Sequence, residues 1–274
     1  GPGEARLVDV PDEPLVPRVP LGEREQPRGA RAEDRLLPRA REAAPAFADT
    51  GLDGVMVENF GDTPFYPNRV PAITVAAMTR AALAAREAAP DLMLGVNVLR
   101  NDAEAALAVA AATGASLVRV NVHVGASVTD QGVVEGRAYH TVRLRRAWGL
   151  DHVRLLCDVA VKHAAPLAAR PIAEEAEELA QRARADAVLV TGSGTGRAAD
   201  DGRVDEVVGA VGVPVYVASG ATAHGLPALL RPRGTRRVHG VVVGSCLRKS
   251  GRAGDPIDPG LALDFARAFR AAVG

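Results

Sequence analysis

The sequence predicts an α/β protein folded as a single closed (β/α)8 barrel, and three observations support this prediction. Short runs of Val, Leu and Ala alternate with helix-like stretches, as in parallel βαβ units. The candidate strands number about eight. The chain has 274 residues, which is close to the usual length of one such barrel. A doubly wound open sheet is the alternative architecture.

The expected strands are short and end abruptly in polar residues, as in GVMVENFGD (54–62). We expect strands at 5–10, 53–58, 92–98, 117–123, 153–159, 186–191, 213–218 and 238–244. Helices are expected between them at 33–50, 69–89, 102–113, 132–148, 172–184, 203–210, 223–230 and 259–272.

Several helix boundaries carry a physical signal. Asp102 is suited to cap a helix N-terminus, and Pro171 is suited to a first helical turn. Gly51, Gly114 and Gly149 follow helical stretches, where a left-handed residue ends a helix without strain.

The N-terminal segment differs in character from the rest. Residues 1–32 are expected to contain three parts. Gly1-Pro2-Gly3 resembles a tag-cleavage remnant, and the first strand and an irregular Pro-rich loop follow it. This loop either lies over the top of the barrel or is a connection with no role. Residues 33–274 are expected to form the remainder of one barrel domain.

Composition excludes several classes of protein. Lys and Arg (33) balance Asp and Glu (33), and aromatic residues are only 3%, which argues against a nucleic-acid partner. The longest apolar runs are too short to insert in a membrane, and no signal peptide is recognisable. Cys157 lies in an apolar strand and is expected to be a buried thiol, as in a cytoplasmic protein.

Alternation within the strands separates an apolar face from a polar face. In the strand at 117–123, valines occupy one face and are expected to meet the helices. The opposite faces point into the barrel, and their polar members are Glu58, Asn97, Arg119, Asn121, His123, Asp158 and Lys162. Buried charges need partners or water, so this set indicates a ligand site. The alternative is a self-satisfied plug in which Arg119 pairs with Asp158 or Glu58.

The last strands suggest a phosphate site. Small residues let backbone N–H groups approach an anion, and loops after the last two strands often bind phosphate in this fold. The candidates are Ser219, Gly220, Gly244 and Ser245. The loop TGSGTG (191–196) begins with Thr191 and Gly192 and is either a lid over the substrate or a plain flexible connection.

Catalytic candidates come from the inward set. Lys162 beside Asp158 is a candidate acid/base or Schiff-base lysine, because burial and a neighbouring charge tune its pKa. Glu58, His123, Asp158 and His163 are types that bind a hard divalent metal, but no tight spacing supports such a site. The sequence therefore indicates no specific cofactor and leaves a divalent metal open.

Several longer motifs together resemble the BtpA (SgcQ-like) family. They are GVMVENFGDTPF (54–65), TVAAMTR (74–80), GVNVLRNDAEAALAVA (95–110), ASLVRVNVHVGASVTDQGVVEGRA (115–138), DVAVKHAAPL (158–167), ADAVLVTGSGTG (185–196) and ASGAT (218–222). The resemblance implies a TIM-like, ribulose-phosphate-binding barrel and a family first linked to photosystem I biogenesis. It does not supply a biochemical activity.

One region departs from the family pattern. The family usually has a GMVHLPPLPG-like first strand and loop, whereas this chain reads RLVDVPDEPLVPRVP (6–20). Asp9 stands where the family has a His, so Asp9 becomes a candidate substrate-binding residue.

The sequence thus predicts an enzyme acting on a phosphorylated sugar or nucleotide-like molecule, as an aldol-type lyase, an isomerase or a glycosyl transferase. Its expected catalytic residues are Asp158, Lys162, Glu58 and His123, and its substrate-binding residues are Asn97, Arg119, Asn121, Asp9, Thr191 and Gly192. A homo-oligomer is compatible with this prediction. The alternatives are a non-catalytic assembly factor for a membrane complex and a small-molecule sensor.

Overall fold

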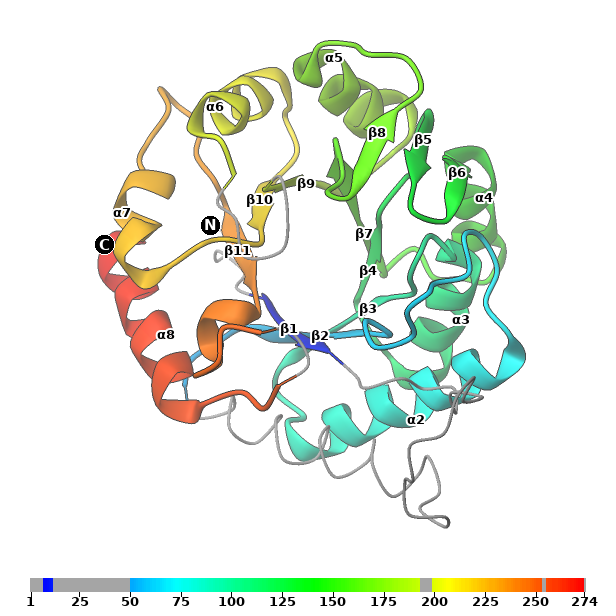
Figure 1. Ribbon diagram of the computed structural model, residues 1–274, viewed down its shortest axis with the longest axis horizontal. Helices are drawn as coiled ribbons and strands as arrows, with labels where there is room; N and C mark the ends of the chain where they lie inside the picture. Colours follow the sequence, from blue (N-terminus) through cyan, green and yellow to red (C-terminus); the bar gives the residue numbers. More distant parts are fainter. Residues whose placement is uncertain (1–6, 12–49, 193–198, 253–254, 274) are drawn as a thin grey trace, which may run out of the picture.

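The described strands of the main sheet are parallel and close into a barrel, which confirms the predicted fold (Figure 1). The computed structural model describes residues 7–11, 50–192, 199–252 and 255–273, without the side chains of 7–11. Because β1 pairs with both β2 and β11, an open sheet is excluded. In barrel order the strands are β1 (Leu7–Pro11), β11 (Gly240–Val243), β10 (Val215–Ala218), β9 (Ala187–Thr191), β7 (Arg154–Val159), β4 (Leu117–Val120), β3 (Met93–Asn97) and β2 (Gly54–Glu58).

Helices surround the barrel, as Figure 1 shows. The helix expected at 33–50 falls almost wholly outside the described residues, and Pro171 is the N-cap of α5 rather than part of its first turn. A π-helical turn, η1 (Glu178–Arg182), continues α5, and a 3-10 turn, η2 (Ala223–Gly225), precedes α7. The helices are α2 (Ala72–Ala88), α3 (Ala103–Thr113), α4 (Ala138–Ala147), α5 (Ile172–Glu177), α6 (Asp201–Ala210), α7 (Leu226–Leu229) and α8 (Pro259–Val273).

The predicted helix boundaries at Asp102, Gly114 and Gly149 are confirmed, whereas the helix expected before Gly51 lies almost wholly outside the described residues. The Asp102 side chain accepts a hydrogen bond from Ala105 N at 2.9 Å and so satisfies a free N–H of the first turn of α3. Gly114 follows α3 with φ +69°, and Gly51 and Gly149 have φ values of +76° and +69°. These glycines adopt the left-handed conformation that side chains disfavour.

The segment expected as one helix over 132–148 is instead a strand followed by a shorter helix. β6 (Gly132–Glu135) pairs antiparallel with β5 (Ala126–Thr129), and β8 (Ala164–Pro166) pairs with the other edge of β5. Helix α4 begins only at Ala138. A short apolar pair such as Val133-Val134 fits either periodicity, so the sequence pattern alone did not separate hairpin from helix.

The barrel has two apolar layers, of which the alternation within strands predicted only the outer one. The outward valines, such as Val96 and Val118, pack with the helices, and Cys157 is a buried free thiol in the same layer. Gly95 leaves room inside the barrel, because a Cβ there would lie 3.2 Å from Met56 Cε. The inner layer is Met56, Leu117, Leu156, Ala187, Leu189, Ala218 and Val242.

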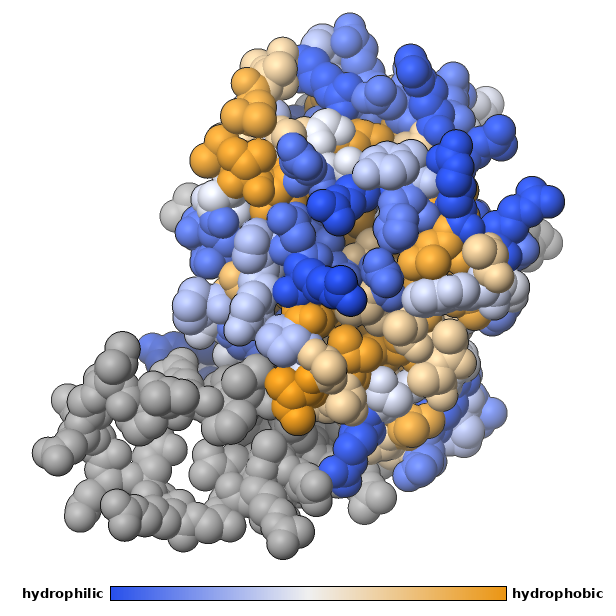
Figure 2. All heavy atoms as spheres, turned by 90° about the vertical axis from the view of Figure 1, so that its right-hand side faces the viewer, coloured by the Kyte–Doolittle hydropathy of each residue, from blue (hydrophilic) through white to orange (hydrophobic). Residues whose placement is uncertain are grey.

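The outer surface is mixed in character. Figure 2 shows polar and charged side chains spread over the face that carries α3 and α4, with apolar groups between them. Single exposed apolar residues of this kind are normal on a folded protein. Within the described ranges, no helix combines the length and apolar character needed to cross a membrane.

Candidate functional site

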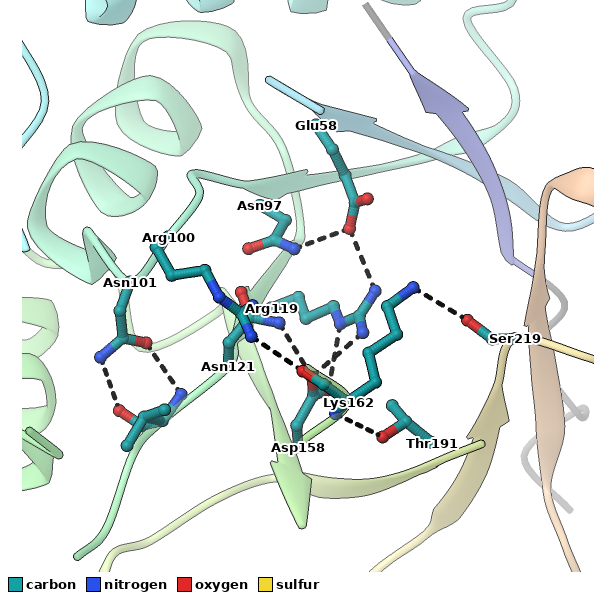
Figure 3. A network of polar contacts seen from close by, with 11 residues as sticks. Glu58, Asn97, Arg100, Asn101, Arg119, Asn121, Asp158, Lys162, Thr191 and Ser219 are labelled. Atoms are coloured by element: carbon teal, nitrogen blue, oxygen red, sulfur yellow. Dashed lines mark hydrogen bonds and ion pairs between the residues drawn. The ribbon is translucent and has the colours of Figure 1, made fainter. Parts of the chain in front are cut away.

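Arg119 is the centre of a hydrogen-bonded network at the carboxyl ends of the barrel strands (Figure 3). Its Nε and Nη2 donate to Asp158 Oδ1 and Oδ2 on β7, each at 3.0 Å. Its Nη1 donates to Glu58 Oε1 on β2 at 3.1 Å. The sequence left open whether Arg119 pairs with Asp158 or with Glu58, and the structure shows both pairs.

Two asparagines extend this network in opposite directions. Asn97, the last residue of β3, donates from Nδ2 to Glu58 Oε1 at 2.6 Å. Asn121 lies one residue beyond β4 and donates from Nδ2 to Asp158 Oδ2 at 2.8 Å. The predicted inward direction of Glu58, Asn97, Arg119 and Asn121 therefore holds.

Arg119 and the two carboxylates that it binds are all buried. The Arg119, Glu58 and Asp158 side chains are 3%, 5% and 0% exposed. Charges removed from water to this extent persist only when hydrogen bonds compensate the lost hydration. Both oxygens of Asp158 accept bonds from Arg119, so Asp158 is suited to fix the guanidinium rather than to exchange protons.

A cavity of about 200 Å³ adjoins this network. The network contributes Glu58, Asn97, Arg119 and Asn121 to its wall, whereas Asp158 does not line it. Asp130, at the turn between β5 and β6, also reaches the wall. The remaining lining residues are Phe60, Thr63, Phe65, Leu99, Arg100, Lys162 and His163. The site thus combines two acids, several cations and an apolar wall.

Arg100 is a site residue that sequence reasoning missed. It is 5% exposed, lines the cavity and donates from Nη2 to the Lys162 carbonyl at 2.8 Å. Burial lowers the pKa of Arg100, and attraction to Asp158 and Asp130 opposes that shift. The available signal was a charged residue three positions after Asn97, but strand alternation does not extend past the end of β3.

Two asparagines hold the loop that carries Arg100. Asn59 Oδ1 accepts from Leu99 N at 2.6 Å, and Asn59 Nδ2 donates to Leu99 O at 3.2 Å. Asn101 accepts from Val122 N and donates to Val122 O, each at 2.8 Å. The loop after β3 is therefore attached to the segments that follow β2 and β4, which fixes the position of the Arg100 guanidinium.

Lys162 links the two halves of the barrel mouth. Its Nζ donates to Ser219 Oγ beyond β10, and its backbone N donates to Thr191 Oγ1 at the end of β9, each at 3.1 Å. Lys162 lies beyond the end of β7, yet it still reaches the cavity as the sequence predicted. An ammonium group here lies between the polar network and the predicted phosphate loops.

The four phosphate candidates lie at the ends of β10 and β11, which pair with each other. Ser219 and Gly220 have φ values of +70° and +72°, and Gly244 precedes a 3-10 turn, η3 (Ser245–Leu247). The Ser219 N–H donates to Val242 O at 3.1 Å, so it is not available to an anion. The four residues do not line the cavity, and Ser219 is connected to it through Lys162. Their phosphate role stays a prediction.

Two further candidates lie at the margin of the described residues. Gly192 is buried directly after β9, and the rest of the expected loop, 193–196, lies outside the described residues. Asp9 is in β1, opposite Met56 in the strand register, and its side chain lies outside the described residues.

The predicted inward direction of His123 is wrong. β4 ends at Val120, and His123 does not line the cavity. Its Nε2 lies 3.0 Å from the carbonyl oxygen of Ala183, so this nitrogen donates and carries the proton in the neutral ring. Burial lowers the pKa of His123, and the geometry gives it no access to a substrate in the cavity.

The residues considered for a metal do not converge. His163 is exposed at the cavity rim with φ +56°, and its pKa is lowered by burial and by Lys162. Among the residues that the structure describes, no group of three or more His, Cys, Asp or Glu side chains is placed to hold a metal ion.

Comparison with known proteins identifies relatives over most of the chain. Residues 30–271 match the model of the BtpA family. The "Photosystem I biogenesis protein BtpA" of Synechocystis sp. is 38% identical over 227 residues, which cover 82% of this chain and 76% of that protein.

Solved structures with the same fold are more distant in sequence. N-(5'-phosphoribosyl)anthranilate isomerase from Pyrococcus furiosus superimposes with a TM-score of 0.55 at 16% identity, covering 97% of this chain and 99% of that chain. 3-Keto-L-gulonate-6-phosphate decarboxylase from Vibrio cholerae gives 0.53 at 10% identity, covering 99% and 97%. At these identities the likeness shows the fold alone, a TIM barrel.

Proposed function

The chain belongs to the BtpA family, and from that premise we propose that it is an enzyme acting on a phosphorylated sugar or nucleotide-like small molecule. The observation that carries the proposal is the cavity of about 200 Å³ at the carboxyl ends of the strands, which Glu58, Arg100 and Lys162 all line. In barrels of this kind the catalytic groups lie at that end. An acid beside cations is suited to a substrate whose negative charge changes during the reaction.

Glu58 is the residue we assign to proton transfer. It lines the cavity, whereas Asp158 does not. Asn97 and Arg119 both donate to Glu58 Oε1, which fixes the orientation of the carboxylate. A carboxylate held in this way can take a proton from a carbon next to a carbonyl, or from a hydroxyl, and return it elsewhere. Isomerisation and aldol-type cleavage both need such a step.

Lys162 and the loops after β10 and β11 are assigned to the phosphate. Lys162 Nζ contacts Ser219 Oγ, so a phosphate bound beside Ser219 and Gly220 would meet the ammonium group directly. The names of the two solved enzymes compared above include a phosphoribosyl group and a 6-phosphate. Their common fold supports the placement, and the chemistry remains our proposal.

The experiment that tests this function measures binding and turnover together. Pentose, hexose and nucleoside monophosphates would be titrated by calorimetry, and bound compounds followed by NMR for conversion. Glu58→Gln keeps an oxygen for Asn97 and Arg119 but cannot exchange a proton, so turnover should fall by about 10²–10⁴-fold. Glu104→Gln is the matched control, since Glu104 is half exposed on α3 and pairs with His140. Unchanged turnover in Glu58→Gln would refute the assignment of Glu58.

The two other catalytic candidates are tested in the same assay. Lys162→Ala should weaken binding of the phosphorylated substrate, because a cation beside Ser219 is lost. Asp158→Ala should lower turnover through Arg119, whose guanidinium loses its bidentate partner. If both variants turn over substrate as the unmodified protein does, the site is wrongly assigned.

An assembly factor is the second candidate, and the name of the Synechocystis relative favours it. An assembly factor needs a partner surface but no polar cavity. Recovery of a stoichiometric membrane complex with the chain, while Glu58→Gln and Lys162→Ala keep full function in cells, would favour it over an enzyme.

A further inference from the structure

The orientation of the Asn121 amide is determined by its neighbour. Asn121 Nδ2 lies 2.8 Å from Asp158 Oδ2, and Asp158 also accepts two hydrogen bonds from Arg119. An ionised carboxylate only accepts, so the NH₂ end of the amide must face Asp158. The carbonyl end, Oδ1, is then turned away from Asp158, and Asn121 is one of the residues that line the cavity, whereas Asp158 is not.

Asn121 Oδ1 has no hydrogen-bond partner among the described residues. The side chain is 97% buried (3% exposed), and Oδ1 itself is buried. A buried acceptor without a hydrogen-bond donor lowers the stability of the folded protein by about 1–3 kcal/mol, so its presence needs an explanation. Asn97 is held in the same way, because its Nδ2 donates to Glu58 Oε1, but its Oδ1 is not among the buried atoms without a partner.

The charges around the cavity limit which chemical group can donate a hydrogen bond to Asn121 Oδ1. Three cations, Arg100, Arg119 and Lys162, line the cavity against two acids, Glu58 and Asp130, so a further cation would meet net repulsion there. The guanidinium nitrogens Nε, Nη1 and Nη2 of Arg119 already donate to carboxylates. A neutral hydroxyl group fits best, because it donates one hydrogen bond without adding charge.

We propose that Asn121 is a specificity-determining residue that accepts a hydrogen bond from one hydroxyl group of the sugar unit of the substrate. The inference rests on the proposed function and narrows it to substrates that carry this hydroxyl. A site built to bind a hydroxyl rejects the analogue that lacks it, since the buried acceptor then stays unpaired.

The test removes the hydroxyl and the acceptor separately. Aldopentose, ketopentose, aldohexose and ketohexose monophosphates are titrated into the full chain, and the tightest binder is compared with its monodeoxy analogues, one for each hydroxyl. We expect one analogue to bind about tenfold or more weakly to the unmodified protein. Asn121→Ala should bind the parent and that analogue equally. Asn97→Ala, the matched control, should weaken binding but keep the discrimination.

The outcomes separate this inference from the proposed function. If Asn121→Ala still binds the parent compound more tightly than the deoxy analogue, as the unmodified protein does, Asn121 does not bind the hydroxyl group. The inference is then overturned, while the proposed function stands. If the folded, unmodified protein binds no sugar phosphate, the proposed function itself fails and the inference with it. Should Asn121→Ala not fold, a crystal structure with the tightest binder decides: a ligand hydroxyl within hydrogen-bond distance of Oδ1 supports the inference, and its absence overturns it.

Discussion

At the scale of single residues, the site depends on one buried cation. Arg119 on β4 binds Asp158 on the adjacent strand β7 and Glu58 on β2, which lies two strands away on the other side, and each carboxylate is buried with it. Sequence alternation predicted that these residues share the barrel interior. It could not predict that Asp158 would accept hydrogen bonds from two guanidinium nitrogens, Nε and Nη2, because that depends on distances between strands.

We predict that Arg119→Met destabilises the protein by about 3–5 kcal/mol, because it leaves two buried carboxylates without their cation. Urea denaturation of the variant and the unmodified protein measures the difference. Arg231→Met is the control, since Arg231 pairs with Asp201 and Asp205 on the surface and should change stability little. Equal losses in both variants would show that the buried network has no special role.

His123 should make stability depend on pH. Burial lowers the pKa of His123 from its ordinary value of 6.5, so the unfolded chain binds a proton more readily than the folded protein does. Its contribution to stability is therefore present above about pH 6.5 and is lost as the pH falls below that value toward the folded pKa.

The variant His123→Gln isolates this effect. The Gln amide can still donate to the Ala183 carbonyl but does not titrate. We expect the free energy of unfolding, measured by urea denaturation from pH 7.5 to 5 (buffer values), to fall less steeply on acidification in His123→Gln. Identical pH profiles would contradict a titration of His123 coupled to folding.

At the scale of elements, the hairpin of β5 and β6 is the main departure from the predicted order. Asp130, at the turn of the hairpin, lines the cavity, and α4 begins only at Ala138. Gly136 makes the junction possible, because a Cβ there would lie 2.5 Å from Val124 N and 2.6 Å from the His123 carbonyl. The sequence contains this glycine, but the close approach is visible only in three dimensions.

We predict that Gly136→Ala destabilises the protein by about 1–3 kcal/mol, because backbone atoms cannot move aside as a flexible side chain can. Gly209→Ala is the matched control. Gly209 lies in α6 with nothing within 4 Å of a new Cβ, so the change should be neutral or stabilising by up to about 1 kcal/mol. Thermal unfolding of both variants measures the contrast, and a neutral Gly136→Ala would contradict the tight junction.

At the scale of the whole molecule, the inner apolar layer joins strands from all around the barrel. Leu189 on β9 is fully buried there with Met56 and Leu156. The polar network lies on the next inward positions, Glu58 and Asp158, toward the carboxyl ends of the same strands. The stability of the barrel interior and the geometry of the site therefore depend on the same layers.

We predict that Leu189→Ala destabilises the protein by about 2–5 kcal/mol, since the cavity left in the barrel interior cannot collapse against paired strands. Leu83→Ala, on the partly exposed face of α2, is the control and should cost less. Denaturant midpoints of the two variants measure the difference, and a larger loss in Leu83→Ala would contradict the closed, packed interior.

The sequence by itself determined the barrel, the approximate positions of its strands along the chain and the inward direction of Glu58, Asn97, Arg119 and Asn121. Successive side chains of a strand point to opposite faces, so the direction of a side chain within a strand follows from its position in the sequence. Only the tertiary structure decided three features beyond the strand ends: that Arg100 reaches the cavity, that His123 does not line it, and that Asn121 Oδ1 has no partner among the described residues. Past the last strand residue the chain has no fixed repeat, and side-chain direction depends on contacts between segments distant in sequence.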